Sequence, residues 1–342
     1  MNSKQRIAMA LNHQQPDRTP FFASFVPEIE QAIRTEQNIT EYDMGVALGN
    51  DMVKSCVGLE MSFYGQPHPR YVDPWGITWQ YIDNEFGTFT EIDEHPLAGD
   101  LSKIDNFQIP DPYEETQYDD FRKKMKLYGK EKWMIGSNQI SIFEACWYLR
   151  GMEDFMVDLA LNQDYATTLI DKVMQFPKVS TAKFIEMGAD MVWFGDDIAC
   201  QQNMMLSMRM WRKFFKPRLA ELFDNCKRLN PNIKIAYHSC GNCMDFIDDM
   251  IEIGLDVLNP LQPMAISPFE VKKRYGDRLS LFGGVCVQQL MPNGTPAQIH
   301  QAISKLKNEC GKDGGYILSP AHHIQADTSL ENIQTFYEAA KQ

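Results

Sequence analysis

Short apolar runs alternate with longer amphipathic stretches along most of the chain. Most of these runs are rich in β-branched or aromatic residues and are bounded by Gly, Asp, Asn or Pro, as buried parallel strands tend to be. The runs are residues 21–25, 52–57, 133–137, 191–194, 233–237, 257–261, 279–283 and 315–318. The pattern therefore predicts eight buried strands.

Several stretches between the runs repeat their apolar residues with a helical period. Single apolar stripes are visible over residues 208–223, 246–253 and 299–306, and a short opening helix is expected over residues 3–11. Alternation of strands with helices is typical of βαβ units with parallel strands. Eight such units favour an α/β fold of the (β/α)8 TIM-barrel type, with an N-terminal helical extension.

The alternation breaks between residues 58 and 131. Residues 71–82 alternate between apolar and polar, a turn is expected at 83–87, and residues 88–92 alternate again, which predicts an inserted β-hairpin. We expect a single domain over residues 1–342, with 58–131 as an excursion such as a lid.

Composition excludes several classes of protein. With 342 residues, 44% of them hydrophobic, the chain can bury a large core and is neither disordered nor collagenous. The formal net charge of −13 argues against nucleic-acid partners and against a polybasic membrane anchor. No secretory leader and no apolar run of about 18 residues is visible, so we expect a cytoplasmic protein away from membranes. The eight cysteines do not form a disulfide framework in such a chain.

The strongest chemical signal follows the fifth run. Alternate residues of a strand share a face, so His238 and Cys240 point to the same side, where imidazole and thiolate could share a tetrahedral Zn²⁺. Gly241 permits a sharp turn that could bring Cys243 near. Alternatively, His238 is a hydrogen-bonded strand-end residue and both cysteines fill the core.

A histidine pair follows the last run. In a closed barrel all strand ends meet at one rim, so His322 or His323 could complete a site with His238 and Cys240. Neighbouring residues of a strand end point in opposite directions, so at most one of the pair should face the centre. The alternatives are binding of a substrate phosphate or carboxylate, or capping of Asp327.

Two further strand ends carry candidate residues. Asp196 and Asp197 could orient a ligand histidine, accept a hydrogen bond from substrate, or act as acid and base, whereas Asp197 could equally cap a helix. Gly283 and Gly284 could present backbone amides to a ligand. Cys286 could be a thiolate ligand, but we expect it to be buried.

Several segments together resemble the uroporphyrinogen decarboxylase superfamily. They are residues 4–7 (Lys-Gln-Arg-Ile), 17–20 (Asp-Arg-Thr-Pro), 73–76 (Asp-Pro-Trp-Gly), 188–190, 238–242 (His-Ser-Cys-Gly-Asn), 281–284 (Leu-Phe-Gly-Gly) and 315–320. That family of (β/α)8 barrels includes decarboxylases and corrinoid-protein methyltransferases that act on methylated compounds or coenzyme M. The decarboxylases carry an arginine-bearing loop, Arg-Gln-Ala-Gly-Arg, for the carboxylates of a tetrapyrrole. Residues 20–27 contain no arginine, so the methyltransferase branch looks closer.

The resemblance implies a metal site and a partner. Zinc ligands in that branch are a His-x-Cys pair, here His238 and Cys240, and a cysteine in a Pro-Gly-Cys segment, where this chain has His322. The implied activity is a zinc-dependent methyl transfer between a small methylated substrate or thiol and a corrinoid (cobalamin) protein.

The same reading assigns roles to polar and aromatic residues. Asp196 and Asp197 would orient a ligand or the substrate, and Gln202, Asn259 and Gln288 would add polar contacts to substrate. Aromatic side chains that could line the pocket or simply pack are Tyr64, Trp75, Trp79 and Trp193. A porphyrinogen decarboxylase and a non-catalytic ligand-binding barrel are the alternatives.

Overall fold

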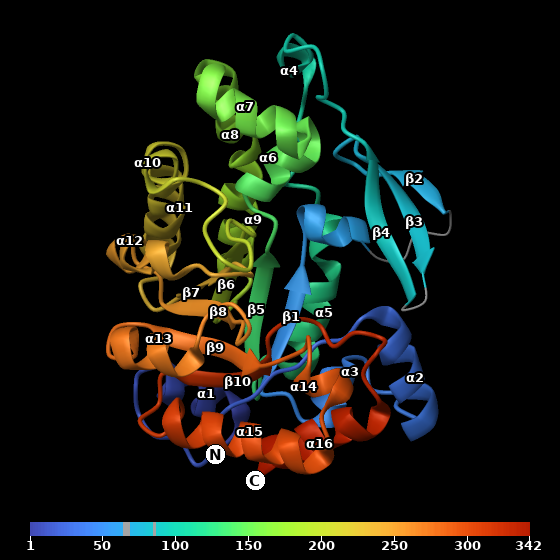
Figure 1. Cartoon of the computed structure of the whole chain (residues 1–342), viewed down its shortest axis with the longest axis vertical. Coiled ribbons are helices and arrows are strands. Elements are labelled where there is room, and N and C mark those ends of the chain that lie inside the picture. The colour runs from blue at the N-terminus through green and yellow to red at the C-terminus, as the bar shows by residue number, and fades with distance from the viewer. Residues whose placement is uncertain (64–68, 85–86) are drawn as a thin grey trace.

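Seven parallel strands form the curled central sheet of the computed structural model, which describes residues 1–63, 69–84 and 87–342 (Figure 1). The strands follow one another across the sheet in chain order, each paired in parallel with the next. They are β1 (Met52–Cys56), β5 (Trp133–Asn138), β6 (Met191–Gly195), β7 (Lys234–His238), β8 (Val257–Leu261), β9 (Ser280–Val285) and β10 (Tyr316–Pro320). The predicted α/β barrel class is confirmed.

The first predicted strand is an irregular segment that joins the two edges of this sheet. The amide of Phe22 donates to the carbonyl of Leu318 on β10 at 3.0 Å, and the carbonyl of Phe21 accepts from the amide of Asp51 at 3.0 Å. Isolated bridges replace a regular ladder here, because the Asn50 and Asp51 side chains take the amides of Ala23 and Phe21. The segment thus occupies the eighth position without forming a regular strand.

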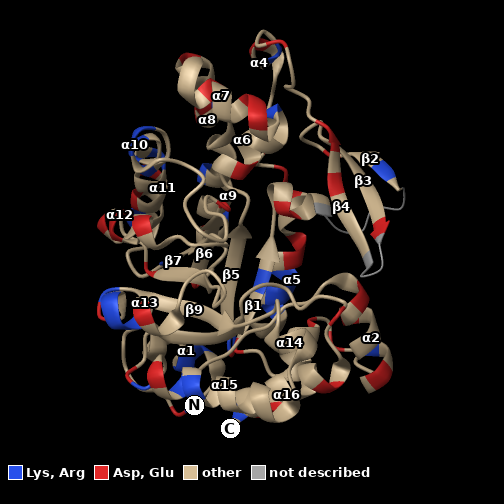
Figure 2. Ribbon diagram, viewed as in Figure 1, with Lys and Arg blue, Asp and Glu red and all other residues tan. Residues whose placement is uncertain are grey.

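Helices surround the sheet, and three of them belong to the N-terminal part. These three are α1 (Ser3–Leu11), α2 (Pro27–Gln37) and α3 (Met44–Leu48). Those that follow β5 are α6 (Phe143–Arg150), α7 (Met152–Leu161), α8 (Gln163–Val173), α9 (Gln175–Glu186), α10 (Met208–Met210), the π-helix η3 (Trp211–Phe215), α11 (Lys216–Leu229), η4 (Met244–Phe246), α12 (Ile247–Glu252), α13 (Pro268–Tyr275), α14 (Leu290–Asn293), α15 (Pro296–Glu309) and α16 (Leu330–Lys341). Acidic and basic residues are intermixed over these helices, as expected for solvated faces (Figure 2). Within the described ranges, no helix is both long and apolar enough to cross a bilayer.

Helix α1 seals the N-terminal end of the barrel. Its Ile7 and Leu11 pack in one buried cluster with inward-facing residues of the strands, such as Met52, Trp193 and Phe282. A capping box between Asn2 and Gln5 begins the helix. With this end closed, a ligand can reach the strand ends only from the opposite, C-terminal rim.

The excursion after β1 contains a three-stranded antiparallel sheet. The elements of the whole excursion are η1 (Gly58–Phe63), β2 (Arg70–Val72), β3 (Thr78–Asn84), β4 (Gly87–Glu94), α4 (Lys103–Asn106), η2 (Glu115–Tyr118) and α5 (Asp119–Tyr128), and its three strands form the sheet. The predicted hairpin is confirmed as β3 and β4, although residues 85 and 86 of its turn lie outside the described residues. The expected first strand over 71–82 is wrong as one strand: Asp73 accepts the amides of Trp75 and Ile77, and this turn divides it into β2 and β3.

Candidate metal centre

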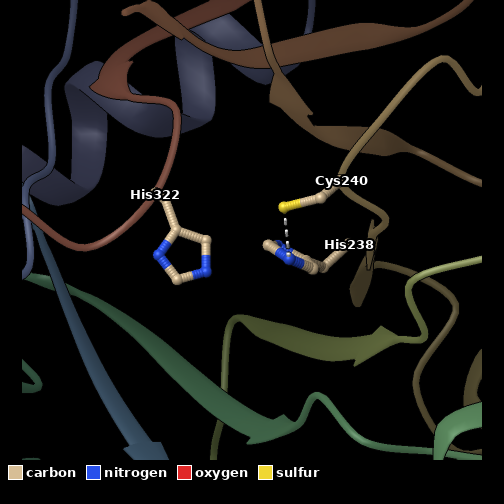
Figure 3. Close-up of side chains that lie close together, drawn as sticks. All are labelled: His238, Cys240 and His322. Atoms are coloured by element: carbon tan, nitrogen blue, oxygen red, sulfur yellow. Dashed lines mark hydrogen bonds between the residues drawn. The ribbon is translucent and has the colours of Figure 1, made fainter. Parts of the chain in front are cut away.

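Three of the predicted side chains meet at the C-terminal rim of the barrel. His238 ends β7, Cys240 follows two residues later, and His322 lies in the loop after β10 (Figure 3). One nitrogen or sulfur atom from each lies within 4.8 Å of the others, and Cys240 Sγ is 3.5 Å from His238 Nε2. Barrel closure therefore brings residues about eighty positions apart to one point, as the sequence predicts.

Asn259, in the middle of β8, sets the orientation of the His238 ring. His238 is buried, and its Nδ1 lies 2.7 Å from Asn259 Oδ1, while Asn259 Nδ2 donates to the carbonyl of Phe282. An amide oxygen can only accept, so the ring carries its proton on Nδ1 and presents Nε2 to Cys240 and His322. Asn259, which was predicted to contact substrate, thus binds the ring of His238 in this structure.

Asp197 lies beside the same ring. Its Oδ1 accepts the backbone N–H of Cys240 at 2.8 Å and is 3.4 Å from His238 Nε2. Burial by itself lowers the pKa of His238, but the Cys240 thiolate and the Asp197 carboxylate outweigh it and raise that pKa well above its ordinary value. The site therefore attracts positive charge to Nε2, where a proton and a metal ion would compete.

The side chain of Asp196 binds backbone amides at the start of helix α6 instead of the His238 ring. Its Oδ1 accepts the amides of Ile142 and Glu144, both at 2.9 Å, and its Oδ2 accepts from the Tyr237 hydroxyl at 3.2 Å. Burial raises the pKa of Asp196 to about 7. The helix-capping role considered for Asp197 thus belongs to Asp196, and Asp197 is the carboxylate that contacts His238 and Cys240.

The loop after Cys240 depends on a glycine. Gly241 has φ +87°, and a Cβ there would lie 2.5 Å from the carbonyl oxygen of Cys200. The turn directs Cys243 into the core, where burial raises the pKa of its thiol to about 12. Cys243 is therefore held as a buried thiol and is absent from the described group of metal-ligand candidates.

A cavity of about 250 Å³ opens beside the three residues. It is lined by Glu60, Gln139, Ile140, Glu144, Tyr148, Asp197, His238, His322 and His323. Sequence reasoning missed Glu60, Glu144 and Tyr148. A signal for Glu144 exists in retrospect, since it is the only charged residue of the apolar stretch 140–149.

Other predicted residues lie at the edge of the site or away from it. Gln202 is exposed, and its carbonyl accepts a hydrogen bond from Asn242 Nδ2. Gln288 is exposed and accepts from Gln262, whose own Oε1 accepts the amide of Gly241. Neither lines the cavity within the described part of the chain.

The remaining candidates are distributed between rim and core. Cys286 is half-buried instead of buried as expected. His323 lines the same cavity as His322, but among the described residues only His322 joins His238 and Cys240 in the group of ligand candidates. Trp75 and Trp79 belong to the excursion and are buried against Phe176 and Tyr148, respectively. Trp193 packs on Phe282 inside the barrel. Tyr64 lies outside the described residues.

The chain matches one protein family and is similar to methyltransferases in sequence and in fold. The family model described as uroporphyrinogen decarboxylase (URO-D) matches residues 76–342. A curated relative, the methylated-thiol–coenzyme M methyltransferase of Methanosarcina mazei, is 23% identical over 203 residues, which are 58% of this chain and 51% of the relative. The chain thus spans about half the length of this relative. A solved methyltransferase from Methanosarcina mazei has a TM-score of 0.73 at 18% identity and covers 100% of this chain and 98% of its own, which shows a shared fold.

Proposed function

Because the chain belongs to the uroporphyrinogen decarboxylase family, we propose that it works in the methyltransferase branch of that family. It would transfer a methyl group between a small methylated substrate or thiol and a corrinoid carried by a partner protein. The observation that carries this proposal is the convergence of His238, Cys240 and His322 beside a cavity. The name of the curated relative supports it, because that enzyme is described as acting on a methylated thiol and coenzyme M.

The donor atoms fit a zinc ion. Two imidazole nitrogens and one thiolate are ligands that zinc favours, and a set of three protein ligands leaves a position for substrate. The hydrogen bond from His238 Nδ1 to Asn259 is the kind of outer contact that orients a zinc-binding histidine. Bound there, zinc would act as a Lewis acid on the sulfur, oxygen or nitrogen that loses or gains the methyl group.

The protein residues would have separate roles around that metal. His238, Cys240 and His322 would hold it, and Asp197 would keep Cys240 in place through the backbone amide. An imidazole at position 322 in place of a thiolate removes one negative charge from the ligand set, which makes the metal a stronger Lewis acid. Gln202 and Gln288 remain candidates for contacts with substrate or partner at the exposed rim.

The decarboxylase alternative is weaker on electrostatic grounds. A porphyrinogen carries several carboxylates that require cationic partners. Residues 20–27 contain no arginine, and among the described residues the wall of the cavity contains neither lysine nor arginine. Nearby Lys54 is paired with Glu60 at 2.6 Å.

Metal analysis of the purified protein tests the proposal. We expect about one zinc per chain, and loss of that zinc in His238→Ala and Cys240→Ala. Cys200→Ala is the matched control, because Cys200 lies on the adjoining loop, is exposed, and is absent from the ligand group. Full zinc occupancy in both ligand variants would contradict the proposal. Metal binding without methyl transfer to or from any corrinoid protein would indicate a ligand-binding barrel.

A further inference from the structure

The loops on one side of the barrel mouth contain no charged residues. They follow β6, β7, β8, β9 and β10, and their stretches without Asp, Glu, Lys or Arg are residues 198–207, 239–244, 262–267, 286–294 and 321–326, which together we call the uncharged rim. Over the whole chain 23% of the residues are charged, so loops of this composition stand out. Depletion of charge is typical of the centre of an interface, because a charge that loses its water there is costly.

Three glutamine side chains are hydrogen-bonded in a row along this rim. Gln262, directly after β8, accepts the backbone N–H of Gly241 on its Oε1 at 2.7 Å. The Nε2 of Gln262 donates to Oε1 of Gln201 at 3.1 Å and to Oε1 of Gln288 at 3.0 Å. The row therefore links the loops that follow β6, β7, β8 and β9, and it is anchored one residue from the ligand candidate Cys240.

The backbone fixes the direction of these hydrogen bonds. The N–H of Gly241 can only donate, so Gln262 must present its oxygen to Gly241 and its NH2 group to the two other glutamines. Gln201 and Gln288 must then each present their oxygen to Gln262. Both residues are exposed, and among the described residues no group accepts a hydrogen bond from either of their NH2 groups. The row thus leaves amide donors available at the mouth, next to the proposed metal centre.

Further uncharged groups enlarge the same surface. Gln202 and Gln289 are exposed amides in the loops that also carry Gln201 and Gln288. Met264, in the loop of Gln262, is exposed and adds a flexible apolar side chain of a kind that is enriched in interfaces. A ligand of this rim should therefore be uncharged, with amide acceptors and apolar groups.

From this arrangement we infer that the uncharged rim binds the edge of the corrin ring, through the NH2 groups of Gln201 and Gln288. The edge of the ring of cobalamin carries acetamide and propionamide side chains, which are uncharged and whose oxygens accept hydrogen bonds from amides. A tetrapyrrole with carboxylates at its edge would instead require cations, which the rim does not contain. The inference rests on the proposed function and names the part of this chain that contacts the partner's cofactor.

Equilibrium dialysis of the full chain against cyanocobalamin tests this contact without any turnover. Cyanocobalamin has no methyl group to transfer, its cyanide keeps the cobalt from binding the thiolate or the imidazoles, and the absorbance of the corrin measures the bound fraction. We expect a Kd of about 1 mM or less. Dicyanocobinamide lacks the nucleotide but keeps the amides of the ring, so its Kd should lie within about threefold of that value.

Matched glutamine variants locate the contact. Gln201→Leu and Gln288→Leu each remove one NH2 group, and each should weaken binding about three- to tenfold, as expected for the loss of one amide hydrogen bond. Gln301→Leu is the control, because Gln301 is exposed on α15 outside the rim, and it should leave the Kd unchanged. Circular dichroism establishes that each variant is folded, and if one rim variant does not fold, the other decides the question.

Metal analysis of the same samples separates the two proposals. If the unaltered protein contains no zinc, the proposed metal centre is refuted and this inference falls with it. If zinc is present but cyanocobalamin binds more weakly than expected, or binds equally to the rim variants and the control, the inference is overturned while the metal centre stands. Binding of cyanocobalamin without binding of dicyanocobinamide would also overturn it, because the nucleotide and not the edge of the ring would then be recognised.

Discussion

Replacing Asn259 tests whether a single outer hydrogen bond controls metal affinity. Asn259→Leu retains most of the side-chain volume but removes the acceptor 2.7 Å from His238 Nδ1, in a place where both residues are buried. The Nδ1–H of the required tautomer would then be buried without a partner, at a cost of about 1–3 kcal/mol. Outer-shell partners of zinc-binding histidines typically contribute 10- to 100-fold in affinity, about 1.4–2.7 kcal/mol, so the two estimates agree.

The assay is competition for zinc with a chelator of known affinity at pH 7, with circular dichroism to establish that each variant is folded. Asn259→Leu should bind zinc about 10- to 100-fold more weakly. Asn259→Asp is the matched control, because it keeps the acceptor and its charge makes the imidazole a better donor, so its affinity should equal or exceed that of the unaltered protein. A folded Asn259→Leu protein with unchanged affinity would refute the assignment of His238 Nε2 as a ligand held by Asn259.

Three further predictions follow from the same structure. Gly241→Ala should lower the free energy of unfolding, measured in urea, by about 1–3 kcal/mol more than Gly99→Ala, because both have positive φ but only the first meets a backbone oxygen, that of Cys200. Equal losses would show that close contact is unimportant there. Asp51→Asn should destabilise by about 3–5 kcal/mol, since the fully buried carboxylate binds two arginines at 2.7 Å, and a loss below about 1 kcal/mol would contradict this. Apparent zinc affinity should rise with pH through neutrality, because the raised pKa of His238 keeps a proton on the ring that the metal must displace; a flat profile from pH 6 to 8 would be incompatible with that competition.

The ligand candidates were predictable because they depend on local periodicity and on closure of the sheet. A strand places His238 and Cys240 on one face whatever surrounds it, and a barrel returns the end of its last strand, with His322, to the same rim. The barrel class followed from the same alternation. Among the eight strands predicted for the barrel, residues 21–25 do not form a regular strand, because two neighbouring side chains bind their amides.

The roles of the acidic residues could not be predicted from the sequence, because they depend on contacts between distant elements. Which of Asp196 and Asp197 caps a helix depends on where α6, from a different βα unit, places its first amides. Glu144 enters the cavity from that same helix, so its contact with Asp197 spans elements that no local pattern connects. Similarly, one carboxylate, Asp73, decides that residues 71–82 turn back instead of running straight.

The seal formed by α1 has a consequence for how the chain folds. Ile7 and Leu11 of this helix pack against strands drawn from the whole sequence, and the carbonyl of Ala10 accepts the amide of Gly315 just before β10. During synthesis the apolar face of α1 emerges before the strands that it packs against, and β10 is the last of those strands to emerge. The apolar face of the helix therefore stays exposed to solvent while the intervening βα units form. Contacts between such distant parts of a chain slow folding, and the exposed apolar surface promotes aggregation. We expect nascent chains that stop before β10 to depend on chaperones that shield this face.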